Sequence, residues 1–529
     1  MASRDTGEDH SSREDKMGKG YNGQNAVTPI PDEGVNTHRV IHKSYRWIIP
    51  FLFLTTTLTY IDRSNVSYAA LQFKPDLHLS NTEYGLGAGI FSIGYLIFQV
   101  PSNLIITKVG APTWLSFIIF CWGIVAAATS AMKNKAQFYA ARFLLGSFEA
   151  GCFPGSWYHL AQFFNSKELA FGYASVASST ALSNIIGAPL AAGLLYMNGV
   201  AGLRGWQWLF IIEGCLTIIY GVILRFVLSP QPARAHFLEP EERRWLQGRQ
   251  DAQHKLSAER NPHQGKWWAP FVGMNFLRLM WLAIAYAITQ FGITAIVYFN
   301  PLIVEAVFFG GGFASKQVAG PKVSDHEQAW KTAKIALIST ILWVPVGLAM
   351  ILISWSTKVH NERNLHSAIP ALVAGVCFLC VPSAIARNHI GGYVLIIVAA
   401  MGVWAPHGPF WSWPKTFLHG QAAAVGIAIF NGVGAIGGFA GPYVVGALVD
   451  TRGGYVTCMQ VLGGLFLVQS AMIICYRPRN IEAENEKSIH QEMARISAKA
   501  EPESDAPAAS PAQPHGANGT AKQGGGALV

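Results

Sequence analysis

The sequence predicts an all-α, polytopic membrane protein with about twelve transmembrane helices in two six-helix bundles. Its composition is the first indication: of 529 residues, 51% are hydrophobic and only 13% are charged, against about 25% charged in an average soluble protein. Charge also gathers at both ends and in the middle of the chain, and long apolar runs fill the rest. Each run is long enough, or nearly so, for a helix of about 20 residues that crosses a bilayer.

The apolar runs fall into two groups of about six, and each run predicts one span. In the first group the runs cover residues 47–60, 84–107, 113–132, 138–164, 171–197 and 206–228. In the second group they cover residues 274–304, 334–355, 365–386, 392–413, 422–448 and 454–476.

The formal net charge of +9 is interpreted as a topology signal, and nucleic acid is not expected as a partner. Short loops rich in Lys and Arg stay on the cytoplasmic side of a membrane, and an even number of spans per half puts both chain ends and the middle segment there. Four lysines are exceptions that fall in loops predicted to lie outside: Lys133, Lys135, Lys316 and Lys322. The basic residues that set the topology are Arg39, Lys43, Arg46, Arg234, Arg243, Arg244, Arg249, Lys255, Arg260, Lys266, Arg477 and Arg479.

These features divide the chain into five predicted parts. Residues 1–45 and 479–529 are polar or rich in Ala, Pro and Gly, so they are expected to be largely disordered cytoplasmic tails. Residues 46–229 form the first bundle and residues 273–478 the second. Between them, residues 230–272 are a cytoplasmic linker with a short surface helix, whose start is predicted at Pro240. The polar N-terminus contains no cleavable signal peptide, and the plasma membrane is the expected location.

No cofactor or metal is expected, and the protein is not expected to be an enzyme. All seven cysteines lie in apolar segments, so no extracellular disulfide framework is visible in the sequence. Cys377 and Cys380 have a metal-like spacing, but without a second pair they are interpreted as packing residues. The chain has no phosphate-binding loop and no constellation for nucleophilic catalysis, so ATP-driven transport is unsupported.

Glycines are dense in two predicted spans. Gly85, Gly87 and Gly89 lie at alternate positions in the second span, and Gly434, Gly437, Gly438 and Gly441 precede Pro442 in the eleventh. Small residues let helix backbones approach closely, while proline interrupts the helical hydrogen bonds. Tight packing and a bend used during rocking are both compatible with this pattern.

Two ionisable pairs interrupt the apolar runs: Asp62 with Arg63, and Arg142 with Glu149. A charge at the bilayer centre costs roughly 2.5–3.5 kcal/mol and usually faces a partner or a watery cavity. Arg142 and Glu149 share one helix face but are separated by about 10 Å, so each needs another partner. Cross-pairing between the first and fourth spans is the economical arrangement, and it predicts a polar path across the membrane.

Several motifs carry a resemblance to the major facilitator superfamily, and within it to the anion:cation symporter family and its fungal allantoate permease branch. They occur in order along most of the chain: Tyr60-Ile-Asp62-Arg63-Ser-Asn65, Gly94-Tyr95-Leu-Ile-Phe-Gln99-Val-Pro101-Ser-Asn-Leu104, Arg142-Phe-Leu-Leu-Gly146-Ser-Phe-Glu149, Trp206-Gln-Trp208-Leu-Phe-Ile-Ile-Glu213-Gly214 and Asn431-Gly-Val-Gly434-Ala-Ile-Gly437-Gly438-Phe-Ala-Gly441-Pro442. The sequence departs from the wider superfamily at Thr107-Lys108, where an acidic residue usually stands, and at Tyr298-Phe299-Asn300-Pro301.

The resemblance implies a secondary transporter that works by alternating access, with its site between the halves at mid-membrane. The expected activity is proton-coupled uptake of a small organic anion, a carboxylate, by a protein that functions as a monomer.

Arg63 is predicted to hold the substrate carboxylate, since the planar guanidinium donates two parallel hydrogen bonds. Tyr60, Tyr95 and Asn431 are predicted to add neutral hydrogen bonds. The resemblance implies proton-coupling roles for Asp62 and Glu149, with Arg142 as their charge partner.

Other interpretations of these residues stay open. Asp62 and Arg63 could form a static ion pair, Glu149 could be structural, and Arg142 could reach the membrane edge. Glu213 is interpreted as a structural residue near the interface. His159, His407 and His419 are further candidates for moving protons.

Two rival functions are an exporter of an acidic metabolite and a non-transporting nutrient receptor. An intramembrane enzyme is a third, but it would need a motif that the chain lacks.

Overall fold

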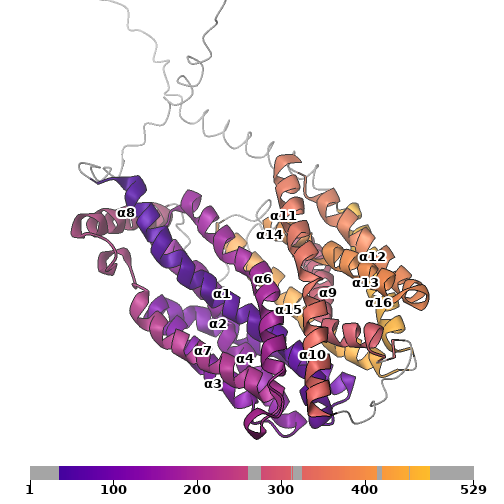
Figure 1. Cartoon of the computed structure of the whole chain (residues 1–529). Helices are drawn as coiled ribbons and strands as arrows, with labels where there is room; N and C mark the ends of the chain where they lie inside the picture. Colours follow the sequence, from indigo (N-terminus) through magenta and orange to yellow (C-terminus); the bar gives the residue numbers. More distant parts are fainter. Residues whose placement is uncertain are drawn as a thin grey trace, which may run out of the picture. The chain divides into compact units, whose positions relative to one another are not determined.

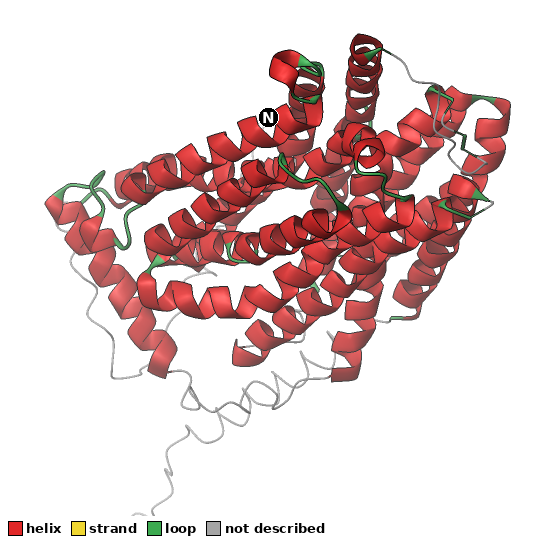
Figure 2. Cartoon of the chain, turned by 90° about the horizontal axis from the view of Figure 1, so that it is seen from below, coloured by secondary structure: helices red, strands yellow, loops and turns green. Residues whose placement is uncertain are grey.

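The computed structural model describes residues 35–259, 276–310, 312–313, 324–360, 362–413, 420–451 and 453–476. His419, Lys316, Lys322, Arg260, Lys266, Arg477, Arg479 and most of both predicted tails lie outside these ranges. Within the described residues the ordered elements are helical, and Figure 2 shows helices throughout.

The first half of the chain forms the helices α1 (Thr37–Asp76), α2 (Asn81–Val109), α3 (Ala111–Thr129), α4 (Lys135–Glu149), α5 (Cys152–Phe163), α6 (Ser166–Leu195), η1 (Val200–Gly202) and α7 (Gly205–Val227). After η2 (Pro232–Arg234) and α8 (Pro240–Glu259), the second half forms α9 (Phe276–Phe308), α10 (Asp325–Thr340), α11 (Trp343–His360), α12 (Asn364–Arg387), α13 (His389–Trp404), α14 (His407–Ser412), α15 (Gly420–Val449) and α16 (Gly454–Cys475).

Ten helical stretches of the described chain are long and apolar enough to cross a membrane. The charged helix α1 and the broken helix α4–α5 fall outside that set, and with them the ten make the twelve spans that the sequence predicts. In the first half α3 packs on α7, α2 on α4 and α1 on α6; in the second half α12 packs on α13 and α16, and α9 on α15. Figure 1 shows these two sets in its indigo-to-magenta and coral-to-yellow parts.

Helix α1 runs well beyond the predicted run 47–60, although its middle is polar. The hydroxyl groups of Thr55, Thr56 and Thr59 donate to the carbonyl oxygens four residues earlier, and those of Ser64 and Ser67 to the carbonyls three residues earlier. These side chains therefore satisfy their hydrogen-bonding groups on their own helix. The polar middle of α1 can then stay buried without interrupting the helix.

Two predicted spans are each broken by a proline. The span predicted over 138–164 divides directly after Glu149, because Pro154 has no N–H for the carbonyl four residues earlier. Pro345 stands at the same place in α11, after the break that separates it from α10. The first break sets Glu149 at a helix end, where its side chain turns toward α1.

The two halves meet most closely where α2 crosses α15. A Cβ atom on Gly85 would overlap the carbonyl oxygen of Pro442, and one on Gly89 would lie 2.6 Å from the carbonyl oxygen of Phe439. Further along, a Cβ on Gly438 would lie 3.1 Å from the Ser92 hydroxyl oxygen. These three glycines thus serve close packing between the halves, and the contact loosens along the helix pair. The other glycines singled out in the sequence pack within their own half: Gly87 against Phe138, and Gly434, Gly437 and Gly441 against α9.

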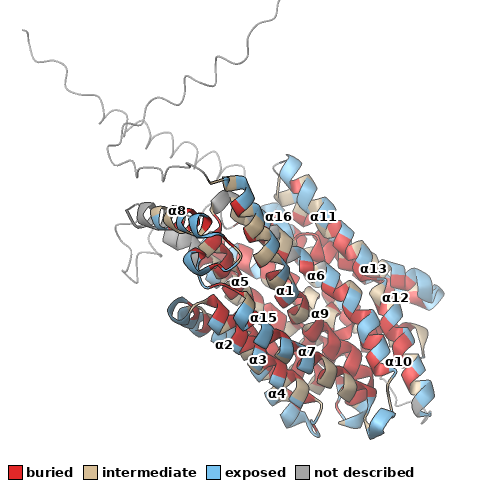
Figure 3. Ribbon diagram, turned by 60° about the vertical axis from the view of Figure 1, so that its left-hand side comes forward, coloured by how far each residue is buried: buried red, intermediate tan, exposed pale blue. Residues whose placement is uncertain are grey.

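At the α8 end of the molecule, the start of α1 is held by an ion pair to α8 and a hydrogen bond to α6. Lys43 Nζ lies 2.7 Å from Glu242 Oε1, and the Tyr45 hydroxyl donates to the Glu168 carbonyl oxygen at 2.8 Å. Burial alone would raise the pKa of Glu242, but hydrogen bonds from Lys43 and from the Glu239 backbone N–H hold it below its ordinary value. Elsewhere, buried residues lie between the helices and exposed ones line the outward faces (Figure 3), as expected for helices that face lipid.

Candidate functional site

Arg63 on α1 and Glu149 at the end of α4 form a buried ion pair. The Arg63 Nε atom donates to Glu149 Oε2 at 2.7 Å, and the Glu149 side chain is completely buried. Cross-pairing between the first and fourth spans is therefore confirmed for these two residues. The second terminal nitrogen of Arg63, Nη2, and the second carboxylate oxygen of Glu149 have no partner among the described residues, so each retains capacity for a ligand.

Three aromatic rings surround the Arg63 guanidinium. Its central carbon lies 5.4 Å from the ring centre of Tyr60, 4.8 Å from that of Phe91 and 5.2 Å from that of Tyr95. Aromatic faces attract a cation at such distances, and more strongly where water is excluded. The structure thus brings Tyr60 and Tyr95 next to Arg63, and it adds Phe91, which the sequence did not single out.

Arg142 lies on α4 of the first half and contacts Tyr298 on α9 of the second half. It is fully buried, it donates from Nη2 to the Tyr298 hydroxyl at 2.8 Å, and its guanidinium lies 4.7 Å from the Phe91 ring centre. Full burial argues against a side chain that reaches for the membrane edge. Its remaining nitrogens, Nε and Nη1, have no partner among the described residues, so the Phe91 ring lies close to two guanidinium groups that both keep free donors.

Tyr298 connects both halves at this point. Its hydroxyl accepts from Arg142 on α4, and its carbonyl oxygen accepts from the Tyr84 hydroxyl on α2 at 2.8 Å. Tyr298 belongs to the motif in which the chain departs from the wider family pattern, and that departure was the available signal for it. The sequence alone did not indicate its partner, because α4 and α9 are far apart along the chain.

Two predicted site residues remain, Asn431 on α15 and Asp62, which precedes Arg63 on α1. Asn431 on α15 donates to Gln99 on α2 at 3.2 Å, which is another contact between the halves. Asp62 is buried, and its Oδ2 atom has no hydrogen-bond partner within the described chain. In the described part of the chain, neither carboxylate oxygen of Asp62 accepts a hydrogen bond from Arg142.

Two of the three histidine candidates, His159 and His407, lie in the described part of the chain. His159 is fully buried, and neither of its ring nitrogens has a partner in the described residues. The Nε2 atom of His407 accepts from the Trp411 ring nitrogen at 3.2 Å. Both rings belong to an aromatic group around Tyr286, which is stacked on Phe430 with ring centres 4.5 Å apart.

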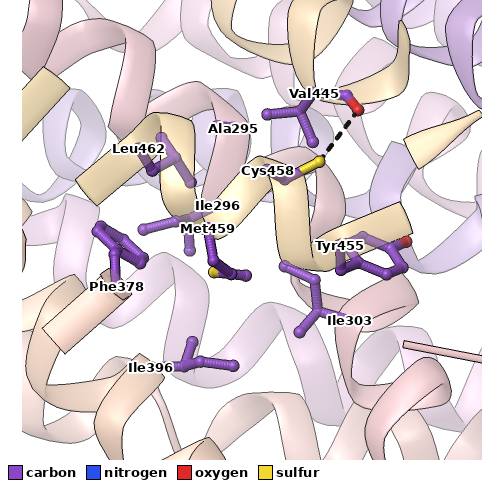
Figure 4. Close-up of a pocket in the computed structure, with 10 residues that line it drawn as sticks. All are labelled: Ala295, Ile296, Ile303, Phe378, Ile396, Val445, Tyr455, Cys458, Met459 and Leu462. Carbon is purple, nitrogen blue, oxygen red and sulfur yellow. Dashed lines mark hydrogen bonds between the residues drawn. The ribbon is translucent and has the colours of Figure 1, made fainter. Parts of the chain in front are cut away.

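An apolar cavity of about 10 Å³ lies between α9, α12, α13, α15 and α16 (Figure 4). Its lining includes Phe378, Met459 and Ile396, and the Cys458 thiol beside it donates to the Val445 carbonyl oxygen. A space of this size is marginal for a single water molecule. It offers no charge for an anion and is separate from the Arg63–Glu149 pair.

Comparison with known proteins agrees with this arrangement. The family model described as the Major Facilitator Superfamily matches residues 52–442. A putative tartrate transporter of Agrobacterium vitis is 32% identical over 87% of this chain and 97% of its own length. A quinolone resistance transporter of Acinetobacter baumannii is 31% identical over 80% of this chain and 91% of its own length.

Solved structures share the fold at low sequence identity. The crystal structure of a D-xylose–proton symporter is 15% identical, covers 81% of this chain and 97% of its own, and superimposes with a TM-score of 0.61. At that identity the likeness concerns the fold alone.

Twelve spans in two bundles, with charged groups buried between them, define a multi-pass membrane protein that transports a small molecule without hydrolysing ATP. The chain belongs to the Major Facilitator Superfamily, and it is a secondary transporter, not an enzyme.

Proposed function

We propose that the protein is a proton-coupled importer of a small organic carboxylate, within the anion:cation symporter branch of the superfamily. The observation that carries this proposal is the buried Arg63–Glu149 pair, in which the anion-binding cation is held by a carboxylate that can take up a proton. The name of the Agrobacterium relative, a putative tartrate transporter, supports a carboxylate as the substrate class.

The coupling follows from competition for Arg63. A substrate carboxylate that binds the guanidinium displaces Glu149, and the displaced side chain is left buried without a counter-charge. A buried carboxylate in that position is stabilised by protonation, because burial of an unpaired charge is costly. Substrate and proton then assist each other's binding, a coupling of typically 1–3 kcal/mol.

The aromatic rings and the second arginine extend the proposed site. Tyr60 and Tyr95 line the Arg63 guanidinium and place hydroxyl groups beside the substrate. Arg142, with two free nitrogens and its guanidinium close to the same Phe91 ring, suits a second anionic or polar group of the same substrate. Tartrate, with two carboxylates and two hydroxyls, is therefore the first ligand to test.

Orientation and location complete the proposal. The basic residues around α8 and the start of α1 favour the cytoplasmic side for both termini, the plasma membrane is the expected location, and a monomer contains the complete site.

The test is uptake of labelled tartrate, followed by a panel of other small organic acids, into proteoliposomes that contain the purified protein. We expect exchange of one acid, lost in Arg63→Lys, because an ammonium cannot donate two parallel hydrogen bonds. The exposed carboxylate variant Glu241→Gln on α8 is the matched control and should retain exchange. No exchange of any organic acid by folded protein would contradict the proposal.

Export is the second candidate function. The quinolone resistance relative has a similar identity to this chain, and the fold permits either direction. Accumulation of the identified acid in cells supports import, whereas faster loss of preloaded acid supports export.

A further inference from the structure

A small cavity lies between α1, α6 and α7, next to the proposed substrate site. Its volume is about 30 Å³, which is room for one or two water molecules or a small ion. Two carboxylates, Asp62 and Glu213, line it together with Thr217. The other lining residues are apolar: Leu58, Ile61, Leu190 and Leu216.

Two oxygen atoms of the lining residues, Asp62 Oδ2 and Glu213 Oε2, have no partner in the described part of the chain, and neither does Oδ1 of Asn65, which does not line the cavity but is hydrogen-bonded to Glu213. Their residues are 5%, 7% and 0% exposed. The Asn65 amide nitrogen donates to the other oxygen of Glu213, so Asn65 is fixed beside that carboxylate. Buried polar atoms are rarely left unpaired, and two unpaired carboxylate oxygens at one small cavity, with an unpaired amide oxygen on the residue bonded to one of them, call for a positively charged ligand.

The helix positions explain why these oxygens gather. Asp62 and Asn65 occupy positions i and i+3 of α1, and Glu213 and Thr217 occupy positions i and i+4 of α7, so each pair shares one helix face. The two faces meet, because Asn65 and Glu213 are hydrogen-bonded.

The charge balance of the mid-membrane region also lacks one positive charge. Its carboxylates are Asp62, Glu149 and Glu213, and its guanidinium groups are Arg63 and Arg142. Three negative groups against two positive groups leave one negative charge uncompensated, and a buried unpaired charge costs several kcal/mol. Arg63 is engaged by Glu149 and Arg142 acts electrostatically on Asp62, so Glu213, which lies beside Asp62 and has no arginine of the described residues acting on it, is the carboxylate left without a cation.

We propose that Asp62, Asn65, Glu213 and Thr217 form a binding site for one monovalent cation, a proton or Na⁺. Carboxylate, amide and hydroxyl oxygens are ligands that hard cations prefer. A proton would instead be shared between the two carboxylates, since two such groups in one site do not both stay charged. Cation binding stands on the geometry, whereas a role of this site in driving transport rests on the proposed function.

The surrounding charges connect this site to the substrate site. Arg142, Arg63 and Glu149 all act electrostatically on Asp62, and Asp62 acts on Glu213. A substrate anion that engages the arginines removes positive charge from the neighbourhood of Asp62. The cation is then bound more firmly, and substrate and cation favour each other.

The first experiment measures thermal unfolding of the full-length detergent-purified protein while NaCl replaces choline chloride at constant ionic strength. A Na⁺ site predicts a saturable rise in Tm, since a ligand that binds only the folded state stabilises it. The rise should vanish in Glu213→Gln and should need several-fold more Na⁺ in Thr217→Val, while Glu241→Gln should behave as the parent.

The second experiment distinguishes the proton. Infrared difference spectra between acidic and alkaline pH should show the C=O stretch of a protonated carboxyl group that persists in Glu149→Gln and disappears in Asp62→Asn and in Glu213→Gln. Glu213→Asp, which keeps the carboxyl, should restore a band. A protein with neither the Na⁺ response nor this band would overturn the proposal, and tartrate exchange by the same preparation would show that the substrate site is intact.

Discussion

Asp450 holds the two halves together at the end of the bundle opposite α8. It follows the last turn of α15, and its carboxylate accepts four hydrogen bonds from the start of α2: from the Asn81 N–H at 3.3 Å and amide at 2.8 Å, and from the Thr82 N–H at 2.8 Å and hydroxyl at 2.6 Å. The first N–H groups of a helix have no partner within it and carry partial positive charge. A carboxylate of the second half thus caps a helix of the first half.

Replacement of Asp450 by Asn should weaken this closed end. The Asn side chain keeps one acceptor oxygen, but its NH₂ group faces two of the four donors on Asn81 and Thr82. The substitution also removes the negative charge that stabilises a helix N-terminus. Hydrogen bonds to charged groups contribute about 1.5–3 kcal/mol, and partial exposure reduces this, so we expect a cost of about 1–2 kcal/mol. At 1.4 kcal/mol per tenfold change, the population closed at this end should fall roughly 5- to 30-fold relative to the open one.

The assay is a distance measurement by double electron–electron resonance between spin labels at Lys133 and Thr451, in a background without the native cysteines. We expect a new, longer distance in Asp450→Asn that is weak or absent in the parent, whereas Asp251→Asn on the surface of α8 should leave the distribution unchanged. Identical distributions for folded parent and Asp450→Asn would refute the argument.

The same carboxylate predicts a pH dependence. Burial alone would raise the pKa of Asp450, but the hydrogen bonds from Thr82 and Asn81 hold it below the ordinary value of 3.8. A lowered pKa in the closed state means that the stabilisation is complete at neutral pH and is lost as the pH falls through that lowered value. The longer distance should therefore emerge in the parent only under acidic conditions.

Three further predictions concern contacts between elements. Tyr298→Phe removes the hydroxyl that accepts a hydrogen bond from buried Arg142. An unsatisfied buried donor costs about 1–3 kcal/mol, so the variant should have a lower Tm and a changed exchange rate. A Tm and exchange rate equal to those of the parent would contradict a role of this hydrogen bond. Gly85→Ala places a methyl group on the Pro442 carbonyl oxygen and should slow substrate exchange strongly, whereas Gly193→Ala, with open space around it, should be near neutral; equal rates would contradict the close packing. Glu242→Gln removes the closer of the two carboxylates that pair with Lys43 and should speed amide hydrogen exchange in α8, which unchanged exchange would disprove.

Much of the fold was predictable because bilayer thickness fixes the length of each span. The buried ionisable residues also indicated that the first and fourth spans would pair, and the Arg63–Glu149 contact bears this out. The break after Glu149 was not predicted, although Pro154 marks it in hindsight. A proline in a membrane helix either bends it or ends it, and neighbouring helices decide which.

The contacts between the two halves could not be predicted from the sequence. Tyr298 and Asp450 each hydrogen-bond residues more than a hundred positions away along the chain, and their pairing depends on how α9 and α15 are set against the first half. For Glu213, the sequence likewise showed only a charged residue near the end of a predicted span. Its significance comes from Asn65 and Asp62 beside it.

Proton entry during transport tests the central claim most directly. Proteoliposomes that contain a pH-sensitive dye receive the transported acid from outside, without a membrane potential, and internal acidification is recorded for the parent and for Glu149→Gln. The account predicts acidification with the parent, and in Glu149→Gln exchange of the acid without acidification, because the freed Arg63 still binds the anion. Acid transport by the parent with no proton entry, or unchanged proton entry in Glu149→Gln, would contradict it.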